Sequence, residues 1–189
     1  MRIPKLGFTV QASLIIFPAM TRTMQWLLLI LSALIILDFT HIFYFNIFTH
    51  SLPYGIYMKI EGAPKRGDYA ATCLTREISQ YGIDRAYLAQ GSCETGTVLV
   101  LKVVQGIPGD HFIVENGSLK INGHSYPIMG KDSSGRALKL FYDQKAGLLN
   151  KGKYILLSDF VKNSWDSRYW GGVSIQFLLK PLWILGHNK

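Results

Sequence analysis

One serine and one lysine stand out in this 189-residue chain as a pair that could perform chemistry together. Ser51 lies in the segment NIFTHSLPYGIY, directly after a long apolar stretch. A serine hydroxyl is a weak nucleophile until a base accepts its proton, and a lysine amine can be that base. Taken alone, Ser51 is more typical of a turn residue before Pro53.

Lys102 lies in a predicted strand, 97–104, that is apolar on both faces. In the run TVLVLKVV, Val100 and Val104 share the face of Lys102, and the residues between them are apolar too. Burial disfavours the ammonium form and lowers a lysine pKa from about 10.4 by up to about 3–5. A neutral amine near physiological pH is a usable base. The alternative is a lysine on an edge strand whose amine reaches solvent.

Other catalytic designs find no support in the sequence. The chain contains no H-E-x-x-H, no G-x-S-x-G and no glycine-rich phosphate loop, and its five histidines lack metal-ligand spacing. We therefore expect no metal and no cofactor. His50 adjoins Ser51, but neighbours on an extended chain point to opposite faces, so His50 is expected to be a poor base for that serine.

Composition argues for lipid and against nucleic acid as a partner. Hydrophobic residues make up 49% of the chain and charged residues 17%, which suggests that part of it lies in a membrane. The net charge is +8, but the lysines are scattered and form no basic stripe with interleaved aromatic residues. Weak attraction to an anionic membrane surface is the favoured interpretation.

The apolar stretch 24–45 is predicted to be one retained transmembrane anchor. Its length, about 22 residues or 33 Å of helix, matches a bilayer core. Arg2, Lys5 and Arg22 precede it, and no lysine or arginine follows until Lys59. This bias places 1–23 in the cytoplasm and the domain 46–189 outside.

The outward domain is predicted to be mainly β. Strands are expected at 97–104, 112–115 and 154–157, between glycine, asparagine and aspartate residues. The pairs Asn116-Gly117 and Asn122-Gly123 favour tight hairpin turns, which predicts a three-stranded meander from His111 to about Tyr126. The polar, turn-rich segment 131–150 is expected to form a loop or flap.

Cys73 and Cys93 are the only cysteines, and both fall in the outward domain. An even count in an oxidising compartment favours one disulfide, which would stabilise the fold by about 3 kcal/mol. The alternative is two unpaired buried thiols.

Four boxes in this order resemble the S26 signal peptidases, and within that family the TraF-type conjugation peptidases. They are SLPYGIY after the apolar stretch, KRGDYA at 65–70, KVVQGIPGD at 102–110 and SDFVKNSWDSRYWG at 158–171. The cysteine pair between the second and third boxes also resembles the TraF-type branch. The resemblance implies an antiparallel β domain with Ser51 as nucleophile and Lys102 as general base.

The resemblance also assigns supporting roles. It implies that Ser164 orients the lysine, that Asp166 is a supporting acid with Arg168 as its partner, and that Asp166 has a suspected catalytic role in the TraF-type branch. Thr49 matches a position whose hydroxyl joins the Ser51 N–H in the oxyanion hole. One residue, rather than two, separates serine and proline, as in the conjugation branch. The last box begins Ser158-Asp159-Phe160 instead of Gly-Asp-Asn, which leaves the role of Asp159 open.

These observations together predict a membrane-anchored serine endopeptidase of the bacterial inner membrane, with its catalytic domain in the periplasm. The expected substrate is a membrane-inserted precursor, a pilin of a conjugation or type IV secretion system, which is hydrolysed or cyclised through an acyl-enzyme. One alternative is a general signal peptidase that acts on exported preproteins. A second is a catalytically silent, membrane-tethered module of secretion assembly.

Overall fold

The computed structural model describes residues 21–47, 49–142 and 144–186, with only the backbone described at 37–41 and at 186. The chain divides into two compact units, Met1–Phe39 and Thr40–Lys189. Most of the predicted cytoplasmic segment, residues 1–20, lies outside the described residues.

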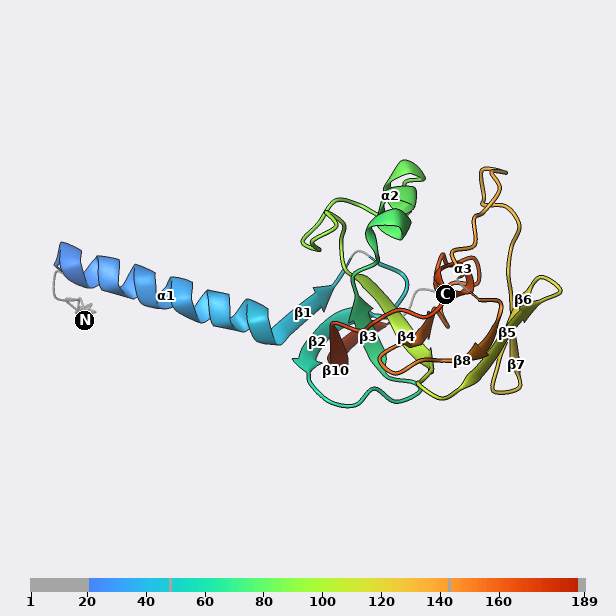
Figure 1. Ribbon diagram of the computed structural model, residues 1–189. Helices are drawn as coiled ribbons and strands as arrows, with labels where there is room; N and C mark the ends of the chain where they lie inside the picture. The colour runs from blue at the N-terminus through green and yellow to red at the C-terminus, as the bar shows by residue number, and fades with distance from the viewer. Residues whose placement is uncertain (1–20, 48, 143, 187–189) are drawn as a thin grey trace, which may run out of the picture. The chain divides into compact units, whose positions relative to one another are not determined.

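The first described element is the helix α1, Arg22–Ile42, which is followed at once by the strand β1, Phe43–Asn46 (Figure 1). In the described part of the chain, no helix is long and apolar enough to cross a membrane. Of the segment predicted as an anchor, 24–45, the part up to Ile42 is in α1 and the last three residues are in β1. The segment Phe43–Asn46 is rich in aromatic side chains that favour strands, and it pairs antiparallel with the next strand.

A six-stranded antiparallel sheet carries the candidate dyad. Its order is β1-β2-β10-β3-β4-β9, with β4 between β3 and β9. Besides β1, the strands are β2 (Tyr54–Ile60), β10 (Phe177–Gly186), β3 (Tyr69–Thr72), β4 (Val100–Gly106) and β9 (Ile155–Leu157). The predicted strand 97–104 corresponds to β4, which begins and ends slightly later.

A second sheet contains the predicted meander, which is confirmed. Its strands are β5 (His111–Glu115), β6 (Ser118–Ile121) and β7 (His124–Pro127), and β8 (Ala146–Leu148) pairs with β5. Asn116 and Asn122 have φ of 49°, and the glycines that follow them are also at positive φ, as a type I′ turn requires. The expected flap 131–150 is thus partly wrong, because three of its residues complete this sheet.

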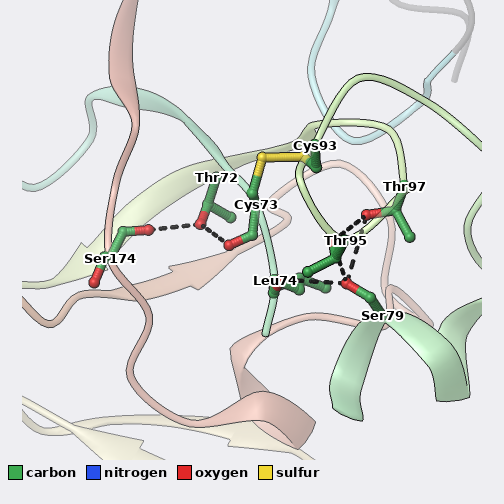
Figure 2. The surroundings of a disulfide bond; sticks show 8 residues. All are labelled: Thr72, Cys73, Leu74, Ser79, Cys93, Thr95, Thr97 and Ser174. Atoms are coloured by element: carbon green, nitrogen blue, oxygen red, sulfur yellow. Dashed lines mark hydrogen bonds between the residues drawn. A yellow bond between two sulfur atoms is a disulfide. The ribbon is translucent and has the colours of Figure 1, made fainter. Parts of the chain in front are cut away.

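Helix α2, Arg76–Asp84, is an element that the sequence analysis missed. Its buried residues, Ile78, Ser79 and Gly82, are spaced to lie on one helix face. Figure 2 shows the Cys73–Cys93 disulfide beside this helix, where the Ser79 hydroxyl contacts the hydroxyls of Thr95 and Thr97. The predicted disulfide is therefore confirmed, and it closes the loop that contains α2.

Replacing both cysteines by serine is expected to lower the free energy of unfolding by about 3 kcal/mol, because the unfolded chain regains the freedom of the closed loop. For a chain of this size the melting temperature should fall by roughly 6–12 °C. Thermal melts with and without reductant check this. Reductant should destabilise the wild type by a similar amount and leave the double variant unchanged. Equal melting temperatures for the two proteins without reductant would contradict the prediction.

The sheet carrying the dyad is packed on both faces. Val100 and Val104 of β4 pack in one cluster with Leu156. Leu101 and Val103 pack in another cluster on the opposite face. The predicted strand with two apolar faces is thus present, and it surrounds Lys102 with hydrocarbon on the face that it shares with Val100 and Val104.

Candidate active site

Ser51 lies in a loop between β1 and β2 whose shape is set by one buried amide. Asn46 is 1% exposed, and its Nδ2 donates to the carbonyls of Leu52 and Pro53, both at 3.0 Å. Its Oδ1 accepts the N–H of Thr49 at 3.3 Å. Leu52, fully buried, fixes the loop to the core next to Ser51. Sequence reasoning missed Asn46, since an asparagine that ends a strand gives no distinctive signal.

Lys102 lies in β4, the strand next to the edge strand β9 of the same sheet, with Ala70 of β3 opposite it. The side chain is buried, the residue being 4% exposed, and Nζ lies 2.5 Å from the Oγ of Ser51. The alternative of an edge lysine in solvent is therefore wrong. The structure brings together two residues that are 51 positions apart in sequence.

Burial is the main cause that lowers the pKa of Lys102 to about 8, because hydrocarbon disfavours the ammonium form. The charge of Asp166 acts in the opposite direction and that of Arg168 in the same direction. Near neutral pH the amine is therefore neutral in a useful fraction of molecules. A neutral Nζ can accept the Ser51 hydroxyl proton, whereas a protonated Nζ can only donate to Oγ.

Asp166 and Arg168 form a buried ion pair behind the lysine. The guanidinium donates from Nε and Nη2 to the two carboxylate oxygens, both at 2.9 Å, and Asp166 is fully buried. Arg168 also donates to the carbonyls of Lys162 and Ser164. Asp166 caps the short helix α3, Ser167–Trp170, by accepting the N–H of Arg168. The contacts of this pair with Ser158, Lys162 and Ser164 hold the segment 158–168 together.

Ser164 and Ser158 connect this segment to the dyad. Ser164 is buried and lines the same cleft as Ser51 and Lys102. The backbone N–H of Ser164 donates to the Val161 carbonyl, and the Ser164 carbonyl accepts from Arg168. The orienting role of the Ser164 hydroxyl stays a prediction. Ser158, which the sequence analysis left without a role, donates its N–H to Asp166 and its hydroxyl to the Ser51 carbonyl at 3.4 Å.

Asp159 points to Gln105 of β4 rather than to the dyad. The Gln105 amide donates to both carboxylate oxygens at 2.9 Å. Burial, with a smaller contribution from the charge of Asp166, raises the pKa of Asp159. The hydrogen bonds between Asp159 and Gln105 therefore connect the segment after β9 to the end of β4.

The two predicted oxyanion-hole groups contact each other. The N–H of Ser51 donates to Oγ1 of Thr49 at 3.1 Å. A substrate carbonyl oxygen must therefore replace the Thr49 oxygen as the acceptor of this N–H. The Thr49 hydroxyl, which keeps its own proton, can then turn to donate to the same oxygen.

One cleft of about 560 Å³ contains the dyad. Thr49, His50 and Ser51 all line it, and the expectation that His50 is a poor base for Ser51 stays a prediction. His50 can line the same cleft as Ser51 because residues 50–52 form a turn, in which side chains do not alternate as they do on a strand. The Tyr54 hydroxyl oxygen lies 2.7 Å from Nδ1 of His50 and forms a hydrogen bond with this ring. Among the described residues, no cluster of histidine, cysteine and acidic side chains could hold a metal ion.

Comparison with known proteins places this site in a family. Two *Escherichia coli* proteins named Plasmid transfer protein TraF are similar to the chain, one 29% identical over 134 residues (67% of this chain, 73% of the relative). The other is 26% identical over 145 residues (71% and 79%). A signal peptidase I structure from Enterococcus faecalis covers 64% of this chain and 100% of its own, at 21% identity and a TM-score of 0.33. The family model described as "Signal peptidase, peptidase S26" matches residues 21–179, and the chain therefore belongs to the S26 signal peptidase family.

Proposed function

We propose that this protein is a serine endopeptidase that cleaves a membrane-inserted precursor through a Ser51–Lys102 dyad. The observation that carries the proposal is the 2.5 Å separation between Ser51 Oγ and Lys102 Nζ, together with the burial that lowers the lysine pKa to about 8. An activated serine needs an adjacent base that is neutral in a useful fraction of molecules at the working pH, and this amine is adjacent and is neutral in such a fraction near neutral pH.

In the proposed reaction, neutral Lys102 takes the Ser51 hydroxyl proton while Oγ attacks the scissile carbonyl carbon. The oxyanion that forms accepts hydrogen bonds from the Ser51 N–H and the Thr49 hydroxyl. The Lys102 ammonium then protonates the leaving amine, and an ester to Ser51 remains. Water or an amine of the substrate attacks this ester and returns its proton through Lys102, which frees the serine.

We further propose that the enzyme works at the periplasmic surface of the inner membrane. Apolar side chains of α1 are exposed, among them Trp26, Leu27 and Ile36. In the other unit, Phe45 of β1 lies in register with Ile56 of β2, which is in register with Trp183 of β10. Phe45 and Trp183 are 46% and 58% exposed. Aromatic and aliphatic side chains of this kind suit a lipid interface.

The proposed substrate is a pilin of a conjugation or type IV secretion system, because both curated relatives are named plasmid transfer proteins. A general signal peptidase with the same chemistry would act on many exported preproteins instead. Co-expression with the candidate pilin, followed by mass spectrometry of the pilin, tests the proposal. The wild type should shorten the pilin, while Ser51→Ala and Lys102→Ala should leave it at full mass.

The control for this experiment is Ser125→Ala, which alters an exposed serine of β7 and should process the pilin normally. A shortened pilin whose mass is lower by one further water molecule would indicate a cyclic product. A shortened pilin without this further mass loss would indicate a hydrolysed product. Pilin of the same mass with all four proteins would overturn the protease proposal. Shortening of unrelated preproteins at a similar rate would favour the general signal peptidase.

The reactivity of Ser51 is expected to rise with pH through about 8, because the lysine must lose its proton to act as a base. Below that pH the rate of labelling by a fluorophosphonate should increase about tenfold per pH unit, and above it the rate should level off. Stopped labelling reactions from pH 5.5 to 9.5 measure this. A flat profile in the wild type would contradict the assignment of Lys102 as base.

A further inference from the structure

The cleft that contains the dyad extends well beyond it along the chain that leads into β4. Lys102 lines one part of this cleft, and Val98, four residues earlier, lines another. At about 3.3 Å per residue of extended chain, these two positions are about 13 Å apart. A peptide segment bound along this edge would therefore place about four residues between the dyad and Val98.

The edge of β4 that faces this part of the cleft is available to an extended peptide. Strand β9 pairs with β4 at Val103, Val104 and Gly106. Val100 and Leu101 precede this paired region and pair with β3 on the other side of β4. An extended peptide can add to such an edge through main-chain hydrogen bonds, with alternate side chains directed into pockets. Residues four positions apart in that peptide would point to the same face.

The part of the cleft around Val98 is apolar. Leu88 lies next to it, because the N–H of Val98 donates to the carbonyl of Ala89. Leu88 and Trp165 both pack on Gly82, where an added Cβ would lie 2.7 Å from Leu88 Cδ1 and 2.8 Å from Trp165 Cζ3. These side chains come from the segment after α2 and from the segment that precedes α3, so the fold brings them together at this end of the cleft.

A strap, residues 129–138, forms the remaining wall and contributes Met129 and Leu138 to the lining. Asp132 holds the strap to the segment after α2, since its carboxylate accepts the Tyr87 hydroxyl at 2.5 Å. The same carboxylate pairs with Arg85 from that segment and with Arg136 from the strap itself. The Asp132 side chain is 7% exposed and that of Arg136 is 44% exposed, so only the carboxylate side of this contact is shielded from solvent.

We propose that this end of the cleft is a specificity subsite, lined by Leu88, Val98, Leu138 and Trp165. It would take one large apolar side chain of the substrate, of leucine to phenylalanine size, about four residues from the scissile bond. Asp132 is a positioning residue that keeps the strap wall in place. This inference rests on the proposed protease function, which supplies the peptide that enters the cleft.

Internally quenched decapeptides with a large apolar, a small, an acidic or a basic residue at each position test the subsite, with the full-length protein in detergent micelles. The wild type should prefer a large apolar residue over an acidic one by about tenfold at one position about four residues from the cut. Leu138→Trp, which fills the cavity, should remove this preference.

Asp132→Asn should raise KM for the preferred peptides and leave kcat within about twofold, because the wall moves while the dyad does not. Asp84→Asn, on α2, is the matched control and should behave as the wild type; Gln80 contacts its carboxylate. Circular dichroism shows whether each variant is folded. A preference that persists in Leu138→Trp, or cleavage by the wild type without any preference, would overturn the subsite.

Binding gives a second readout that does not depend on cleavage. Ser51→Ala, incubated with the same peptides, should retain those with the large apolar residue, as measured by mass spectrometry of the bound fraction. Adding Leu138→Trp should abolish this enrichment. Absent labelling of Ser51 together with absent cleavage would reject the protease function, whereas absent enrichment would reject the subsite.

Discussion

Replacing Lys102 by methionine should abolish the proposed cleavage and at the same time stabilise the fold. Loss of the proposed general base should reduce the proposed cleavage by about 10²–10⁴-fold. The gain in stability has a separate cause, because burial lowers the pKa of Lys102 from 10.5 to about 8. At about 1.4 kcal/mol per pH unit, the folded protein is destabilised by about 3 kcal/mol at pH 7, where the buried amine is mostly charged.

The difference in stability between the wild type and the methionine variant depends on pH. Between pH 8 and 10.5 the unfolded lysine keeps a proton that the folded lysine has lost, so the stability of the wild type rises with pH in this window. The methionine variant lacks this titration. Its advantage should therefore be largest below pH 8 and should disappear near pH 10.5.

Urea unfolding of both proteins at pH 7 and pH 10 measures the difference directly, because titrations of other groups cancel. Lys120→Met, at an exposed lysine paired with Glu115, is the matched control and should change stability by less than about 1 kcal/mol at either pH. A methionine variant less stable than the wild type at pH 7 would mean that burial of the amine is not what lowers its pKa.

Sequence reasoning succeeded where a short segment determines its own structure. The two Asn-Gly pairs predicted the turns of the meander because positive φ at those residues is a local preference, and both asparagines adopt it. Lys102 could be predicted to be buried because the residues on both faces of its strand are apolar. The disulfide followed from the presence of only two cysteines.

Contacts between segments that are far apart in the sequence could not be predicted from local patterns. Asp132 and Tyr87 are 45 positions apart, and no local pattern in the strap indicates that its carboxylate would accept that hydroxyl. Asn46 acts through the carbonyls of a loop, whose positions depend on the packing of Leu52. For His50, the alternation rule for strands does not apply, because this residue lies in a turn.

Removing Arg168 should produce the largest loss of stability among the substitutions considered. Arg168→Met leaves the carboxylate of Asp166 fully buried without its bidentate partner. An uncompensated buried charge typically destabilises a fold by about 3–5 kcal/mol. The carbonyls of Lys162 and Ser164 also lose their donors, so the segment beside the dyad should loosen.

The double variant Asp166→Asn/Arg168→Met separates the charge effect from the lost packing. With the buried charge removed, the double variant should be more stable than Arg168→Met, and the coupling between the two sites should exceed about 1 kcal/mol. Arg168→Met should also raise the pKa of Lys102, because the guanidinium charge lowers it. Urea unfolding gives the first quantity, and the pH profile of Ser51 labelling gives the second. Additive losses in the double variant, with an unmoved pH profile, would show that the ion pair neither holds this segment nor affects the base.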